Sequence, residues 1–204
     1  MKLACVFLAG GKGSRYGKRK QDVDFMGKPL WRHAYDTVAQ IISAERIVRV
    51  GMDVEGGETR TMSVCNGLMA LPSDIERVLI VEAARPLVTK AQLLELAYDN
   101  HDSTSFVTPL VNTVIKRDGD YLNRSELYDL LTPQAFNYIK LLNAFNTGKY
   151  FDYTDDTRIM YEHYGIKPFL IETGTNLVKV TYQGDLSIVE ALYKQMCKDG
   201  RFEG

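Results

Sequence analysis

Residues 3–20 read LACVFLAGGKGSRYGKRK, and this stretch decides the fold. Its first part is a continuous apolar run from Leu3 to Leu8, which is typical of a strand covered on both faces in a parallel sheet. The run ends in glycines, whose backbone amides can turn toward an anion without interference from a Cβ atom. We therefore expect a buried first strand whose carboxyl end opens into a glycine-rich loop.

The glycine-rich loop also concentrates positive charge, in Lys12, Arg15, Lys18, Arg19 and Lys20. Glycines and cations together describe a polyphosphate site. The spacing does not fit a P-loop, because Lys18 is followed by Arg rather than by Ser or Thr, and it lacks the GxGxxG pattern of dinucleotide-binding proteins. Taken alone, the loop is equally compatible with a solvated basic turn.

Downstream of this loop, apolar runs alternate with helical periodicities. Pro29 suits the first position of a helix in which Leu30, Ala34 and Val38 recur at helical spacing. The capping-box pair Thr89 and Gln92 marks another helix start. Strands are predicted at 46–52, 77–81 and 106–110, and a helix at 58–71. This alternation predicts an α/β fold, a Rossmann-like doubly wound and mostly parallel sheet, whose ligands bind at the carboxyl ends of the strands.

The middle of the chain breaks this rhythm. Residues 111–116 and 121–124 flank the turn Arg117-Asp118-Gly119-Asp120, a pattern that favours a β-hairpin, and we expect 111–134 to form a projecting hairpin arm. Because the chain has no internal repeat or linker-like segment, residues 1–204 are predicted to form a single domain. Beyond the arm, helices are predicted at 137–145, 155–164 and 185–196, and strands at 169–171 and 177–180.

The composition excludes several classes of partner. The 204 residues include 25 Lys plus Arg and 26 Asp plus Glu, which gives a formal net charge of −1. That balance argues against nucleic acid or an anionic membrane bound through the whole surface. No apolar run approaches the roughly 20 residues that a transmembrane helix needs. The cysteines, Cys5, Cys65 and Cys197, are odd in number and widely spaced, which predicts reduced thiols in a cytoplasmic protein.

Glu82 follows the apolar run at 77–81 and is the candidate metal ligand. Mg²⁺ prefers one or two carboxylates together with substrate phosphate oxygens, so a carboxylate that faces a basic phosphate loop is suitable. The alternative is that Glu82 pairs with Arg85 or a nearby lysine. The cluster Thr154-Asp155-Asp156 is interpreted as a helix N-terminus capped by Thr154 rather than as a metal site.

Six motifs occur in order from the first strand to the last helix. They are LAGGKGSR at 8–15, Lys20-Gln21, GGETRTMS at 56–63, EAARP at 82–86, Arg124 eight residues before Thr132-Pro133-Gln134, and Lys179-Val180-Thr181. In this set the chain resembles the 2-C-methyl-D-erythritol 4-phosphate cytidylyltransferase family and its relative, ribitol-5-phosphate cytidylyltransferase. The resemblance implies a Mg²⁺-dependent enzyme that transfers CMP from CTP to a small phosphorylated polyol and releases pyrophosphate.

The resemblance also implies roles for individual residues. Arg15, Lys20 and Lys179 would be catalytic and act on the phosphates of CTP. Glu82 would bind the metal. Thr113, Arg124 and Thr132 would hold the phosphorylated polyol, with the arm reaching into the partner subunit's site in a homodimer. The nucleotide would be bound by Ala9, Gly10, Gly11, Gly13, Gly57, Glu58, Ser63 and Arg85.

Departures from the family pattern concern the metal and the acceptor. Glu82 stands where the family has Asp, Asn176 stands where a second acid is expected, and Asn112 replaces an Asp. These changes leave two alternatives open: a CTP-binding protein with impaired catalysis, and a nucleotidyltransferase for a different phosphorylated acceptor or base. The segment between Met52 and Gly56 is also short. Relatives fit an additional helix and strand there, so we expect a smaller sheet.

Overall fold

The computed structural model describes residues 1–11, 13, 16–17 and 19–200. Its central sheet consists of β1 (Leu3–Leu8), β4 (Ile47–Val50), β5 (Arg77–Glu82), β6 (Ser103–Pro109), β9 (Tyr128–Asn137) and β10 (Phe169–Glu172). The strands follow the order β10-β6-β9-β5-β1-β4. As its apolar run predicts, β1 lies inside the sheet, parallel to both β4 and β5. The sheet is mostly parallel, because only β9 runs antiparallel to its neighbours.

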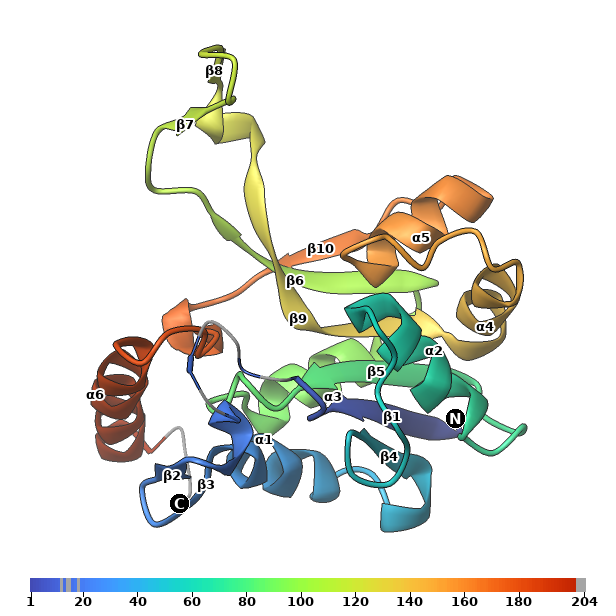
Figure 1. Cartoon of the computed structure of the whole chain (residues 1–204), viewed down its shortest axis with the longest axis horizontal. Helices are drawn as coiled ribbons and strands as arrows, with labels where there is room; N and C mark the ends of the chain where they lie inside the picture. Colours follow the sequence, from blue (N-terminus) through green and yellow to red (C-terminus); the bar gives the residue numbers. More distant parts are fainter. Residues whose placement is uncertain (12, 14–15, 18, 201–204) are drawn as a thin grey trace.

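Helices cover both faces of this sheet (Figure 1). Successive residues of a strand point to opposite faces, so β1 contributes to two apolar layers. Ala4 and Val6 pack with α2 (Arg60–Met69), α4 (Tyr138–Asn146) and α5 (Asp156–Tyr164). Cys5 and Phe7 pack with α1 (Leu30–Ala39) and α3 (Lys90–Tyr98) on the other face. The predicted doubly wound α/β architecture is confirmed, and no helix of the described residues is long and apolar enough to cross a membrane.

The C-terminal helix packs beside the glycine-rich loop. α6 (Asp185–Lys198) contributes Val189 and Met196 to a third apolar cluster that also contains Tyr16 and Phe25. Gln183, just before α6, donates to the Tyr16 carbonyl at 3.1 Å. The remaining short elements are β2 (Asp24–Phe25), β3 (Lys28–Pro29) and the 3₁₀ turns η1 (Lys20–Asp22), η2 (Ala44–Arg46), which precedes β4, and η3 (Arg124–Glu126), which precedes β9.

The predicted hairpin arm projects from the sheet between β6 and β9 (Figure 1). Near its tip, β7 (Val114–Ile115) and β8 (Tyr121–Leu122) pair antiparallel on either side of a turn in which Gly119 has φ +100°. Val111 and Tyr121 are 78% and 76% exposed. No residue of 111–127 belongs to the apolar clusters of the described chain. The arm therefore presents apolar side chains that the rest of its own chain does not cover.

Two features of the secondary structure differ from expectation. Residues 128–134 are expected in the arm, yet they belong to β9, which fills the centre of the sheet and pairs with strands on both sides. Residues 177–180 are predicted as a strand but do not join the sheet: the 3₁₀ turn η4 (Thr175–Leu177) precedes Val180, whose N–H donates to the Ala84 carbonyl at 2.8 Å. This backbone hydrogen bond joins the segment to the residues that follow β5, but it is not part of a strand ladder.

Two local predictions have opposite outcomes. Thr154 is not the cap of α5; Asp155 is, because its carboxylate accepts the Thr157 N–H at 2.8 Å. The short connection after β4 is confirmed: between Met52 and Gly56 the described residues form no helix or ladder strand, and only an isolated bridge joins Val54 to Val50.

Candidate active site

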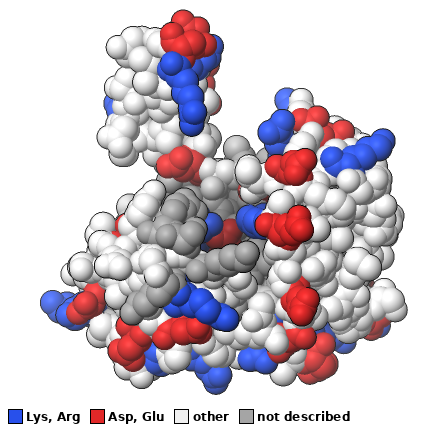
Figure 2. All heavy atoms as spheres, in the orientation of Figure 1, with Lys and Arg blue, Asp and Glu red and all other residues white. Residues whose placement is uncertain are grey.

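The carboxyl ends of β1, β4 and β5 meet at one edge of the sheet. In their register, Leu8 lies beside Val50 on one side and Glu82 on the other. A cavity of about 460 Å³ opens at this edge, and Figure 2 shows charged side chains gathered in a hollow below the arm. Most of the predicted site residues line the cavity: Ala9, Gly10, Gly11, Gly13, Lys20, Gly57, Glu58, Ser63, Glu82 and Lys179.

The glycine-rich loop is held at its start by close backbone contacts. The Ala9 N–H donates to the Val50 carbonyl at 2.9 Å. Gly10 passes so close to Gly51 that a Cβ atom on Gly10 would lie 3.2 Å from Gly51 Cα. Gln21 is 3% exposed, and its Nε2 donates to the carbonyls of Ala9 at 2.8 Å and Gly11 at 2.9 Å. An anion-binding loop needs its carbonyl oxygens engaged away from the anion, and Gln21 engages two of them.

Glu82 lies between two cations at the end of β5. Lys179 pairs with its Oε2, and Arg60 donates from Nε to Oε1 at 3.1 Å. Burial opposes ionisation of this carboxyl, but Lys179 and Arg60 outweigh it and lower the pKa of Glu82 to about 2. Glu82 is therefore ionised at every physiological pH. Of the alternatives stated from the sequence, a lysine is an observed partner, and Arg85 forms no ion pair with Glu82 among the described residues.

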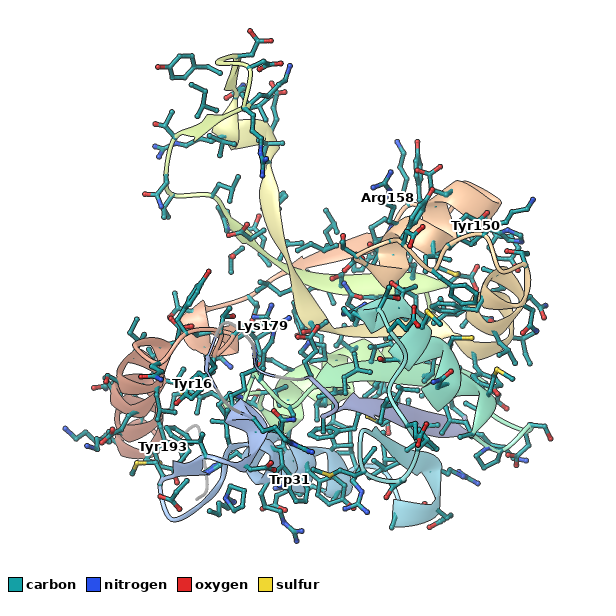
Figure 3. All side chains as sticks on the ribbon, in the orientation of Figure 1. Tyr16, Trp31, Tyr150, Arg158, Lys179 and Tyr193 are labelled. Carbon is teal, nitrogen blue, oxygen red and sulfur yellow. The ribbon has the colours of Figure 1, made fainter. Side chains whose placement is uncertain are left out.

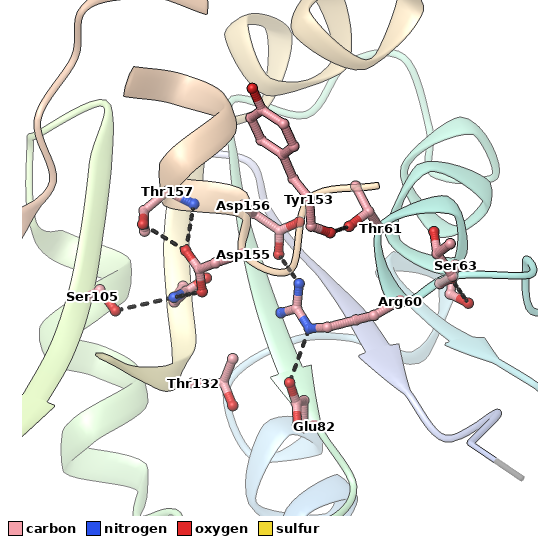
Figure 4. A network of polar contacts seen from close by, with 12 residues as sticks. Arg60, Thr61, Ser63, Glu82, Ser105, Thr132, Tyr153, Asp155, Asp156 and Thr157 are labelled. Carbon is pink, nitrogen blue, oxygen red and sulfur yellow. Dashed lines mark hydrogen bonds and ion pairs between the residues drawn. The ribbon is translucent and has the colours of Figure 1, made fainter. Parts of the chain in front are cut away.

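Arg60 and Asp156 belong to this site, although neither is predicted from the sequence as a site residue. Arg60 donates from Nη1 to Asp156 Oδ2 at 2.8 Å, so one guanidinium joins the carboxylates of β5 and α5 (Figure 4). Arg60 also lines the cavity. Arg60 lies within the GGETRTMS motif, and this position could have indicated from the sequence that it belongs to the site. Asp156 carried no such signal, because an acid in the first turn of a helix has a sufficient local explanation.

The two lysines reach the cavity from different segments. Lys20 comes from η1 and donates from Nζ to the Val180 carbonyl at 2.6 Å. Lys179 precedes Val180 in the segment before α6 (Figure 3). Since Val180 is itself bonded to Ala84, both cationic side chains are tied to the end of β5. Two ammonium groups and one carboxylate thus converge on the glycine-rich loop, an arrangement suited to a polyphosphate.

Arg85 and Thr132 contact each other. Arg85 Nε donates to Thr132 Oγ1 at 2.8 Å, and Nη1 donates to the Leu177 carbonyl. Both side chains are buried, and neither lines the cavity. Arg85 therefore braces β9 and η4 against the end of β5, so that it supports the cavity from behind.

The remaining predicted residues lie elsewhere. Thr113 and Arg124 are exposed on the arm and do not line the cavity of their own chain; Arg124 donates to the Val111 carbonyl. Arg15, like Lys12 and Lys18, lies outside the described residues. Asn176 also faces away from the cavity, because its Nδ2 donates to the Leu87 carbonyl at 2.8 Å and to Gln92 Oε1 at 2.9 Å.

Comparison with known proteins agrees with this geometry. The family model described as 2-C-methyl-D-erythritol 4-phosphate cytidylyltransferase matches residues 3–195. Among curated proteins, the 2-C-methyl-D-erythritol 4-phosphate cytidylyltransferase of Aquifex aeolicus (strain VF5) is 35% identical over 92% of this chain and 95% of its own length. The protein of the same name from Thermotoga neapolitana is 30% identical over 93% of this chain and 96% of its own length.

Solved structures share the fold. 4-Diphosphocytidyl-2C-methyl-D-erythritol synthase from Anaerococcus prevotii DSM 20548 has a TM-score of 0.78 at 22% identity, over 95% of this chain and 96% of its own. 2-C-methyl-D-erythritol 4-phosphate cytidylyltransferase from Thermus thermophilus has a TM-score of 0.76 at 21% identity, over 95% and 100%. The family match and the 35% identical relative go beyond the fold: the chain belongs to the 2-C-methyl-D-erythritol 4-phosphate cytidylyltransferase family, whose members are CTP-dependent nucleotidyltransferases.

Proposed function

We propose that this protein transfers CMP from CTP to 2-C-methyl-D-erythritol 4-phosphate within a single nucleotidyltransferase domain. The observation that carries the proposal is the convergence of Lys20, Lys179 and Glu82 on a glycine-lined cavity at the carboxyl ends of β1 and β5. Phosphoryl chemistry is catalysed mainly by positioning and charge neutralisation, and this cavity supplies both. The names of the relatives support the choice of acceptor.

The proposed reaction is an in-line displacement at the α-phosphorus of CTP. A phosphate oxygen of the acceptor forms a bond to that phosphorus while the bond to the β-phosphate oxygen breaks, and pyrophosphate leaves. The acceptor phosphate is already ionised, so no general base is needed. Lys20 and Lys179 stabilise the negative charge that gathers at the α-phosphate, and the loop held by Gln21 receives the phosphates. Gly57, Glu58 and Ser63 form the wall proposed to read the cytosine.

We also propose Mg²⁺ as the cofactor, with Glu82 as its protein ligand. The described residues contain no group of three or more His, Cys, Asp and Glu placed to hold a metal by themselves. A single carboxylate fits Mg²⁺ in the mode in which substrate phosphates supply further oxygens, and phosphates that attract Lys179 would release Glu82 Oε2 for that purpose. Bound there, the ion would neutralise phosphate charge.

A homodimer would bring the arm residues into use. Thr113 and Arg124 do not line the cavity of their own chain, and the exposed apolar side chains of the arm favour burial against a second copy. We propose that the arm of one subunit supplies both residues to the acceptor phosphate in the other. Light scattering tests this directly, and a monomer at micromolar concentration would contradict it.

We also propose that the protein is cytoplasmic. The proposal is supported by the odd number and wide spacing of its cysteines, which favour reduced thiols.

The decisive experiment measures pyrophosphate release from CTP with a panel of phosphorylated acceptors. Methylerythritol, ribitol, glycerol and heptitol phosphates would be compared, and ATP, GTP and UTP would replace CTP in parallel. We expect turnover to require CTP and to be fastest with methylerythritol phosphate. Calorimetric binding of CTP without turnover on any acceptor would contradict the proposal and favour a protein with impaired catalysis. Faster turnover with ribitol phosphate would instead move the acceptor assignment to the related enzymes.

Replacing Gln21 with leucine is expected to raise the KM for CTP about tenfold, because two loop carbonyls lose their buried donor, at a cost of about 1–3 kcal/mol. The KM is measured by pyrophosphate release at saturating acceptor. The matched control is Gln195→Leu, which removes an exposed amide on α6 that bonds to Asp199. Equal KM values for the two variants would show that Gln21 does not support the loop.

A further inference from the structure

Arg60 is the first residue of α2, and its guanidinium joins two carboxylates that come from distant parts of the chain. Nε reaches Glu82 at the end of β5, and Nη1 reaches Asp156 at the start of α5 (Figure 4). The Asp156 side chain is fully buried, and that of Glu82 is 9% exposed. The two anions and the cations Arg60 and Lys179 form a neutral group of four charges, most of it removed from water.

A buried carboxylate needs a partner, and the partner of Asp156 is Arg60. Burial raises the pKa of Asp156 to about 6, although Arg60 favours its ionised form. Asp156 Oδ1 has no hydrogen-bond partner among the described residues. Apolar residues would stabilise this position at lower cost, because an ion pair loses much of its attraction to desolvation. The buried Arg60–Asp156 pair is therefore not explained by stability alone, and we look for its role in the cavity that Arg60 lines.

The geometry of Glu82 provides that explanation. Its side chain has three rotatable bonds; Oε2 pairs with Lys179, and Oε1 accepts a hydrogen bond from Arg60. If Arg60 did not hold Oε1, the carboxylate could turn and engage Lys179 with both oxygens. Lys179 would then be withdrawn from a phosphate in the cavity. The planar guanidinium of Arg60, fixed by Asp156 from behind, prevents this rotation.

We propose that Arg60 is a positioning residue of this enzyme: it acts through Glu82 to keep Lys179 available for the nucleotide phosphate, and Asp156 orients it. The effect on turnover rests on the proposed cytidylyltransferase function. The backbone of Arg60 is held independently of its charge, because the neighbouring hydroxyls of Thr59 and Thr61 donate to the carbonyls of Phe151 and Tyr153. Conservative variants at Arg60 are therefore expected to fold.

The first test compares Arg60→Lys and Asp156→Asn with the wild type. Lysine keeps the positive charge but cannot bridge two carboxylates, and asparagine keeps the shape of Asp156 without its charge. We expect kcat to fall about ten- to a hundredfold, since misplacement of a reacting group costs that much, and the KM for CTP to change less than about twofold. Arg158→Lys is the matched control, because Arg158 lies on α5 in an exposed pair with Glu162; its kcat should equal that of the wild type.

A double-mutant cycle separates positioning from a merely structural role. Because Arg60 acts through Glu82, Arg60→Lys should have no further effect on kcat in a Glu82→Gln background. Losses that multiply in the double variant would overturn the proposal. So would a kcat that follows thermal stability across the variants, which unfolding curves recorded on the same samples would reveal.

A measurement without turnover distinguishes failure of this inference from failure of the proposed function. Competitive acetylation of Lys179 in the nucleotide-free protein, followed by mass spectrometry, reports how tightly Glu82 holds its ammonium group. We expect Arg60→Lys to slow acetylation of Lys179 about threefold, because an ammonium group held by both oxygens of Glu82 is less available to the reagent. Unchanged acetylation would overturn the inference whether or not the wild type turns over CTP.

Discussion

Alanine in place of Lys179 is expected to lower kcat for pyrophosphate release by about 10²- to 10³-fold, the usual loss when one preorganised charge donor is removed from a transition state. Lys20→Ala should have an effect of similar size, because Lys20 lines the same cavity from η1, whereas Lys179 lies in the segment before α6. Neither change should unfold the protein. The Lys179 side chain is 34% exposed, and Glu82 keeps its bond to Arg60 when Lys179 is lost.

The control for both variants is Lys194→Ala. Lys194 lies on the exposed surface of α6 and pairs with Glu190, so its removal takes away a lysine-glutamate pair without touching the cavity. Steady-state kinetics at saturating CTP and acceptor would be recorded with unfolding curves for all three variants. Wild-type kcat in both Lys20→Ala and Lys179→Ala would refute the proposed assignment of the cavity as the catalytic site.

The second large effect is expected from Gly51→Ala. Gly51 has φ +91°, and a Cβ atom there would overlap Gly10 Cα and lie 2.6 Å from Gly10 N. Both contacts are with backbone that cannot rotate away, so β4 must separate from the start of the glycine-rich loop. We expect the free energy of unfolding to fall by about 3 kcal/mol, as for overpacked core positions combined with left-handed strain. Urea denaturation measures this loss, and calorimetry should show much weaker CTP binding by the folded fraction.

Gly119→Ala separates strain from steric overlap. Gly119 has φ +100° at the turn of the arm, and a Cβ atom there would meet nothing within 4 Å. Its loss of stability should be about 1–2 kcal/mol at most, the cost of left-handed backbone alone. If Gly51→Ala destabilised the protein no more than Gly119→Ala, the close crossing of β4 and the loop would not matter for stability.

Local sequence signals predicted much of the fold and part of the candidate site. The apolar run of β1 and the capping box of Thr89 and Gln92 are explained by neighbours in the chain, and both are confirmed. Glu82 follows the same logic, because the end of a buried strand in a parallel sheet is where ligands bind. These features can be predicted without knowing which distant residues contact them in the folded protein.

Features decided by distant contacts escaped prediction. Arg60 and Asp156 are 96 residues apart, and their pairing exists only because α2 and α5 cover the same face of the sheet. β9 contains Pro133 and the charged Asp129, which weaken its strand pattern, and its register with β5 and β6 is set by the tertiary fold. Residues 177–180 are predicted as a strand but do not form one. Leu177 and Val180 are buried like strand residues, but they pack in two different apolar clusters.

The position of β9 also fixes the order in which the sheet can be completed during synthesis. Both partners of β6, β9 and β10, follow it in the chain, and β9 also pairs with β5. A nascent chain that ends before residue 128 therefore has no strand for β6 to join, while β5, whose residues are all buried in the finished fold, keeps an uncovered edge. The β6 side of the sheet can join the β5-β1-β4 side only after the arm and β9 have emerged from the ribosome. The central strand is thus the last connection between them, made after translation has passed the middle of the message.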